Sequence, residues 1–301
     1  MREEKALPQA ATTSRLGLGI RRWGRGSIKF AQRQPLGAAS LGVLIIFTVM
    51  ALLEPWIAPY DSTITSPGEG LQAPSVRHWF GTDQLGRDLY SRILGGARVS
   101  LQVSFFSIAI GTTAGYLLGI VSGYIGGKLD DWLQRAIDAM LAFPPILLAL
   151  TIVAVLGPGL DKVVFAISFT FAPRAARVSR GVVLSVKENV YIDAARVVGS
   201  STTRIVLWHI LPNSMAPYLI LASVALGGAI LTEAALSYLG LGVPDPYPSW
   251  GRMMSGAAQE LALIAPWMVL FPGAAISVIV LAFNLFGDAL RDIWDPRLRG
   301  R

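Results

Sequence analysis

Cysteine is absent from the 301 residues, and histidine occurs only twice, as His78 and His209. The lack of cysteine excludes a disulfide framework and thiolate metal sites, although it does not fix the redox compartment. The chain also has no G-x-x-x-x-G-K-[S/T] phosphate loop, no H-E-x-x-H pair and no G-x-S-x-G turn. We therefore expect a protein that is not an enzyme and that binds no metal or cofactor itself.

Charged residues are scarce as well, at 15% of the chain, whereas soluble domains average about 25%. Hydrophobic residues make up 53% and gather in long runs. This composition indicates an integral membrane protein. A net charge of +7 would also suit nucleic-acid binding, but the basic residues lie beside the apolar runs, as in membrane proteins. We expect a lipid bilayer as partner and no nucleic acid.

The apolar runs predict an all-α, polytopic fold with six transmembrane helices, since one span needs about 20 apolar residues. Pro144 and Pro145 predict a kink in the third span. The fourth run is short, and Arg174, Arg177 and Arg180 follow it at a spacing that keeps them near one helical face. We expect this helix to cross the bilayer and continue into water. The six runs are residues 36–57, 99–124, 137–156, 163–172, 216–239 and 264–286.

The distribution of basic residues predicts that both termini are cytoplasmic. An even number of spans puts the two ends on one side of the membrane. With the N-terminus inside, most of the 26 Lys and Arg residues fall on the cytoplasmic side, as the positive-inside rule requires. The polar stretch between the fourth and fifth spans, residues 187–212, is then cytoplasmic too.

Residues 187–212 predict a compact helical hairpin, which we call the hairpin. Ala194 and Ala195 favour helix and leave room for a close neighbour, and Gly199 suits a left-handed C-terminal cap. Ser200 and Ser201 can cap a short second helix, and Pro212 is tolerated in the first turn of the next span. Such a hairpin is either a rigid docking element or a solvated connector, and local geometry alone does not decide between them.

The hairpin sequence resembles the EAA-type coupling signature of ATP-binding-cassette (ABC) importer permeases. DAARVVG and, nine residues on, HILP follow its spacing, with Asp193 in place of the usual glutamate and His209 where the general pattern has isoleucine. Segments such as HWFGTDQLGRDLYSRILGGARVSL, IDAMLAFPPILLAL and EAALSYLGLGVPDPYPSWG are similar to the second permease subunit of dipeptide, oligopeptide and nickel importers. The likeness covers about residues 28–296. The residues that match the signature are Asp193, Ala194, Ala195, Gly199, Leu211 and Pro212.

This resemblance implies a type I ABC importer permease fold in the cytoplasmic (inner) membrane of a bacterium or archaeon. It also implies four kinds of subunit: this chain, a second homologous permease subunit, two ATPase subunits that bind ATP and magnesium, and an extracytoplasmic substrate-binding protein. The hairpin would dock on an ATPase subunit as a coupling helix. Peptides are the first expectation for the substrate; nickel complexes, glutathione and other small solutes remain open.

The resemblance also suggests how the chain is divided. Residues 1–34 would be a cytoplasmic tail, whose basic stretch 14–30 forms either an amphipathic interfacial helix or a disordered segment. Residues 35–98 would hold the first span and an external segment, residues 99–290 the permease core, and residues 291–301 a cytoplasmic tail.

Polar residues outside the hairpin give further candidates. Asp83, Arg87 and Asp88 are expected to form an external charge network, which is either structural or a contact for the binding protein or outer gate. Glu233 and Asn284 lie within predicted spans, where polar groups are functional suspects. Either could face the pathway, and Glu233 could instead hold its helix to the partner subunit.

Two rival functions fit less well. A membrane-embedded hydrolase would need a catalytic cluster, but the predicted topology puts the two histidines on opposite sides of the bilayer. A secondary transporter would be expected to show internal repeats and mid-membrane charges, and the two halves of the chain show no convincing repeat.

Overall fold

The computed structural model describes residues 32, 34–256 and 260–294. The tails predicted at 1–34 and 291–301 lie largely outside this part of the chain. The basic stretch 14–30, with its two alternatives, lies wholly outside the described residues.

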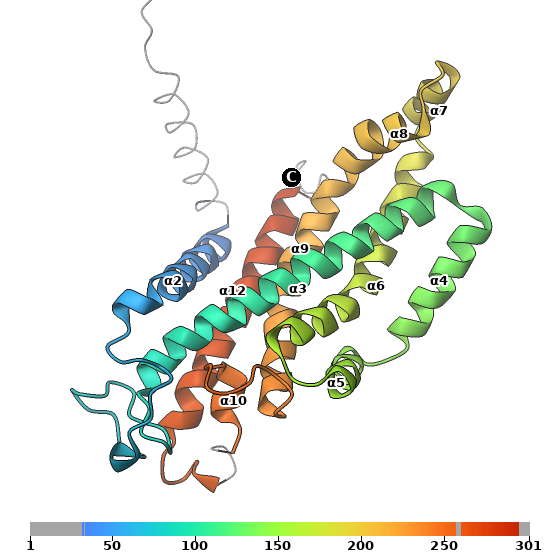
Figure 1. Ribbon diagram of the computed structural model, residues 1–301. Coiled ribbons are helices and arrows are strands. Elements are labelled where there is room, and N and C mark those ends of the chain that lie inside the picture. The colour runs from blue at the N-terminus through green and yellow to red at the C-terminus, as the bar shows by residue number, and fades with distance from the viewer. Residues whose placement is uncertain (1–31, 33, 257–259, 295–301) are drawn as a thin grey trace, which may run out of the picture.

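The described residues form helices joined by turns, with no strand among them. Four long helices run beside one another and a shorter one packs against them, whereas a helical hairpin projects at one end (Figure 1). The elements are α2 (Pro35–Ile57), the 3₁₀-helix η1 (Pro67–Glu69), α3 (Leu89–Ile125), α4 (Gly127–Leu141), α5 (Pro145–Leu156), α6 (Leu160–Lys187), α7 (Val190–Val197), α8 (Thr202–Ile205), the π-helix η2 (Val206–Ile210), α9 (Leu211–Tyr238), α10 (Trp250–Met254) and α12 (Trp267–Trp294).

Four described helices are long and apolar enough to cross a membrane: α2, α3, α12 and the continuous helix Thr202–Tyr238. The bent pair of α4 and α5 would make a fifth span. α6 does not qualify on composition, because Lys162 and Arg174 bracket its apolar part. The helical membrane fold is therefore confirmed, but the count of six spans is not. α6 does continue past its arginines, as predicted, and ends at Lys187.

The third predicted span is two helices instead of one kinked helix. α4 and α5 meet at a bend of 90°, and α5 starts at Pro145. Pro144 has an extended backbone (ψ 130°), because a residue that precedes proline is pushed out of the helical region. The expected kink is thus a complete break.

Glycines bring α3 and α6 into close backbone contact. Gly111, Gly115 and Gly119 are four residues apart, and a β-carbon on any of them would overlap backbone atoms of α6. Small residues at this spacing let membrane helices approach closely. At the end of the bundle near the hairpin (Figure 1) α4 adds to this pair, since Asp130 accepts from Arg180 Nη2 at 2.6 Å.

Candidate functional site

The first arm of the hairpin, α7, ends in the left-handed cap that its sequence predicts. Gly199 has φ +82°. The N–H of Ser200 donates to the Ala195 carbonyl at 3.0 Å, and that of Gly199 donates to the Arg196 carbonyl at 2.9 Å. These two bonds are the Schellman pattern, which satisfies helix-end carbonyls and reverses the chain sharply. The corner between the two arms is therefore well defined.

The second arm differs from its prediction, because it is not a separate short helix. Ser201 caps it as expected, accepting from the Arg204 N–H at 3.3 Å. α8, η2 and α9 then follow without a break, and Thr202–Tyr238 is one helix. Pro212 cannot donate a backbone hydrogen bond, and the wider π-turn just before it absorbs that defect. The second arm and the following span therefore form one continuous rod.

The inner face of the hairpin is anchored to the rest of the chain. Ile192, Ile205 and Ile210 are buried together with Tyr116 of α3 and Val183 of α6. Burial of each such side chain stabilises the fold by about 2 kcal/mol. The hairpin is therefore held to the ends of the long helices and is not a loose connector.

Apolar side chains also cover part of its outer face. Val197, Val198 and Trp208 are 87%, 85% and 73% exposed. Figure 1 shows that α7 lies at the far end of the molecule, away from the bundle. Exposed apolar groups that cluster on a protruding element mark an interaction surface. These residues were not predicted from the sequence. The Val197-Val198 pair inside an otherwise polar stretch could have indicated an exposed apolar surface.

The signature residues occupy two different positions. Asp193 and Ala194 are exposed on α7, whereas Ala195 is half-buried. Asp193 accepts from Arg196 Nη1 at 3.1 Å on the same helix. Leu211 and Pro212 lie further back, in the first turn of α9. The first part of the signature therefore lies on α7 at the end of the hairpin. The second part lies at the start of α9, which continues towards the bundle.

His209 is the position that departs from the general pattern. Its ring lies 5.9 Å from that of Tyr191, measured between centroids. Its carbonyl accepts from Asn213 Nδ2 at 2.6 Å, beside Pro212. The histidine therefore packs between the two arms of the hairpin.

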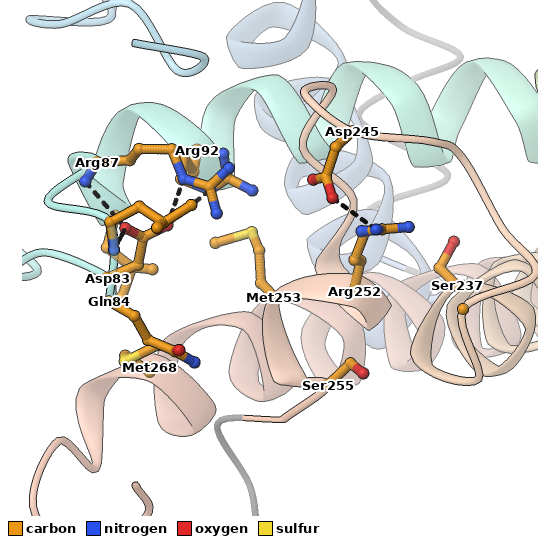
Figure 2. A pocket seen from close by; sticks show the side chains of 13 residues that line it. Asp83, Gln84, Arg87, Arg92, Ser237, Asp245, Arg252, Met253, Ser255 and Met268 are labelled. Carbon is orange, nitrogen blue, oxygen red and sulfur yellow. Dashed lines mark hydrogen bonds and ion pairs between the residues drawn. The ribbon is translucent and has the colours of Figure 1, made fainter. Parts of the chain in front are cut away.

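Figure 2 shows the segment for which the sequence predicts a charge network. Asp83 accepts from Arg87 Nε at 2.6 Å, and the buried Arg92 lies 3.6 Å from the same carboxylate. Asp88 does not join this group. It accepts from the Ser91 N–H at 2.9 Å, capping α3, and it lies 2.9 Å from His78 Nδ1. Asp88 thereby starts α3 ten residues before the predicted span.

Asp83, Arg87 and Arg92 line a cavity of about 320 Å³. Arg252 and Asp245 pair at 2.5 Å on another part of its wall, as Figure 2 shows. Within the described residues, no three His, Asp and Glu side chains come together as a metal site would require.

Glu233 and Asn284 have different environments. Glu233 is fully buried, and its carboxylate accepts from Ser100, Ser237 and Ser249 at 2.7, 2.7 and 3.0 Å. These bonds tie α9 to α3 and to the segment before α10, so the Glu233 carboxylate is used inside the chain in this conformation. Asn284 is exposed on α12 and lines a second cavity.

Known proteins resemble the chain along most of its length. Residues 115–300 match the family described as binding-protein-dependent transport system inner membrane component. Residues 31–74 match the N-terminal TM domain of oligopeptide transport permease C.

Two curated relatives cover nearly the whole chain. The dipeptide transport system permease protein DppC of Alkalihalophilus pseudofirmus is 43% identical over 91% of this chain and 90% of its own length. The glutathione transport system permease protein GsiD of Escherichia coli is 42% identical over 89% of each. The chain therefore belongs to the family of binding-protein-dependent transport system inner membrane components.

Proposed function

We propose that this chain forms half of the translocation pathway of an ATP-driven peptide importer. In this proposal it works beside a second permease subunit, two ATPase subunits that bind ATP and magnesium, and an extracytoplasmic binding protein. The observation that carries the proposal is the hairpin, because it combines a fixed corner, an exposed apolar outer face and direct continuity with a membrane span. The peptide substrate is supported by the relative that is named a dipeptide permease.

The hairpin would act as a lever. A docked ATPase subunit would press on the outer face of α7 around Val197 and Val198. The Schellman corner and the buried isoleucines would carry that movement into α8. Because Thr202–Tyr238 is one helix of 37 residues, about 55 Å long at 1.5 Å per residue, a displacement at the hairpin would also move the membrane part of α9. The same movement would open the pathway to alternate sides of the membrane.

The lever requires the hairpin to lie in the cytoplasm. The excess of basic residues on the hairpin side supports this orientation. Both termini would then be cytoplasmic, in the inner membrane of a bacterium or archaeon. The external charge network and its cavity would face the binding protein.

Glutathione is a second candidate substrate, because one relative is named a glutathione permease. Glutathione is itself a tripeptide, so the two candidates differ in selectivity and not in mechanism. The ligand that co-purifies with the binding protein separates them.

Purification of the native complex tests the proposal. We expect this chain to be recovered with a second permease and an ATPase, and ATP to drive peptide uptake into proteoliposomes. A preparation of this chain that transports without any ATPase, driven by a proton gradient, would overturn the proposal.

A further inference from the structure

Three arginines follow one another along α6, and two of them have carboxylate partners on α4. Arg180 pairs with Asp130 at 2.6 Å, and Arg177 pairs with Asp138. Arg174 lies one turn before Arg177 on α6, and it is exposed. Within the described residues it makes no ion pair and no side-chain hydrogen bond. The guanidinium of Arg174 therefore has N–H donors that no acceptor in the described residues satisfies.

The Arg174 side chain lines a cavity of about 230 Å³ between α3, α6, α9 and α12. Asn284, on α12, lines the same cavity, and its amide likewise makes no hydrogen bond in the described part of the chain. The Thr112 hydroxyl donates to the Ile108 carbonyl at 2.6 Å and is therefore already used. The rest of the lining is apolar: Phe171, Leu221, Val224, Ala225, Gly228 and Leu231.

The position of this cavity makes an unpaired arginine costly. Arg174 is about 20 Å along α6 from Leu160, at 1.5 Å per residue. Ala172, two residues before Arg174, packs against Gly115 of the α3 span. A charged side chain at such a depth is normally paired or belongs to a substrate path. A transient anionic partner would explain why Arg174 has no ionic partner among the described residues.

We propose that Arg174 and Asn284 form a site for the carboxylate of the transported peptide. A guanidinium offers paired N–H donors that match a carboxylate, and the Asn284 amide adds another donor. The cavity is smaller than the pockets of about 300–1,000 Å³ that enclose whole ligands, so it suits the end of a peptide. The inference rests on the proposed function and names the chemical group that this wall of the pathway recognises.

The absence of cysteine from the chain allows a direct test. Leu221→Cys puts a single thiol of this chain on the cavity wall. The complete permease and ATPase complex, without its binding protein and with partner cysteines replaced, is treated with a charged thiol reagent. Alanylalanine or its C-terminal amide is added, and the slowing of labelling is measured. Leaving out the binding protein removes its own preference for peptide ends.

We expect half-maximal protection at an alanylalanine concentration about tenfold below that of the amide, as one charge-assisted bond would give. Arg174→Gln should abolish this difference, and Arg174→Lys should keep part of it. Arg177→Gln, which removes an arginine that already has a partner, should leave the difference intact. Equal labelling rates without peptide, and equal recovery of the ATPase, establish that the variants are folded.

Equal protection by the two peptides, no protection by either, or a difference that survives Arg174→Gln would overturn the inference. ATP-driven uptake by the unmodified complex is measured in parallel. Uptake without a carboxylate effect rejects the site alone, whereas a lack of ATP-driven uptake rejects the proposed function.

Discussion

At the residue scale, Gly199 shows how a single backbone angle can set the shape of the hairpin. Its φ of +82° is one that L side chains rarely adopt, and a β-carbon added there would meet nothing within 4 Å. The constraint at this position is therefore conformational and not steric crowding. Asparagine visits the left-handed region far more readily than a β-branched residue does.

We predict that Gly199→Val strongly lowers ATP-driven uptake, whereas Gly199→Asn keeps most of it. Valine would cost about 1–2 kcal/mol in the left-handed region, enough to displace the corner between the two arms. Uptake is measured at equal amounts of chain in the membrane. Wild-type uptake by the valine variant, or equal losses in both variants, would reject the role of this corner.

Glu233 is the second position where one residue has a large structural effect. We predict that Glu233→Ala destabilises the protein by about 3 kcal/mol, because three buried hydroxyls lose their acceptor. Ser249→Ala removes only one of these bonds and should cost about 1 kcal/mol. Thermal unfolding of the purified complex checks both values. A Glu233→Ala protein as stable as the Ser249→Ala protein would show that the serines find other partners.

At the element scale, the contact between α3 and α6 depends on glycine spacing. We predict that Gly115→Leu prevents assembly, since its side chain would overlap the backbone of Ala172. Gly181→Leu is the matched control. Gly181 lies on α6, the partner helix, and a β-carbon there meets nothing within 4 Å. The fraction of chain that elutes with its complex in size-exclusion chromatography is the measurement. Normal assembly of the Gly115 variant contradicts the close packing.

Several elements could be predicted from the sequence, and the reasons for the failures are physical. Apolar runs located α2, α9 and α12, since they reflect burial in lipid. They could not reveal that α3 starts at Leu89, because Asp88 caps a polar stretch before the apolar one. Pro212 was expected to start a new helix; the π-turn that compensates for it depends on hydrogen bonds that no periodicity records.

The features of the candidate site also fall into those that the sequence predicts and those that it does not. The Gly199 cap and the Ser201 cap follow from local backbone chemistry, so the sequence predicts them. Exposure of Val197 and Val198 depends on how the hairpin docks against α3 and α6, and it could not be foreseen from composition. Likewise, Glu233 accepts three hydrogen bonds because Ser237 of its own helix meets Ser100 of α3 and Ser249 before α10 at this point.

At the scale of the whole molecule, the hairpin that we propose to bind the ATPase and the cavity that we propose to bind substrate lie in different parts of the chain. The hairpin projects from one end of the bundle (Figure 1). α9 continues from it, carries Glu233 and lines the cavity of Arg174. In the proposed function, ATP is hydrolysed on a separate subunit, and its energy reaches this chain through a contact surface. The exposed apolar face of α7 is where we propose that it enters.

Crosslinking at Val198 tests this central claim most directly. Val198→Cys gives this chain a single thiol on an 85% exposed residue, and Val155→Cys gives one on an 80% exposed residue of α5 as the matched control. Each is loaded with a photoactivatable thiol reagent in the complete complex. We predict that Val198 crosslinks to the ATPase subunit, with a yield that changes when ATP is added, and that Val155 does not. Equal yields at the two positions, or adducts of Val198 that never include the ATPase, would contradict the account.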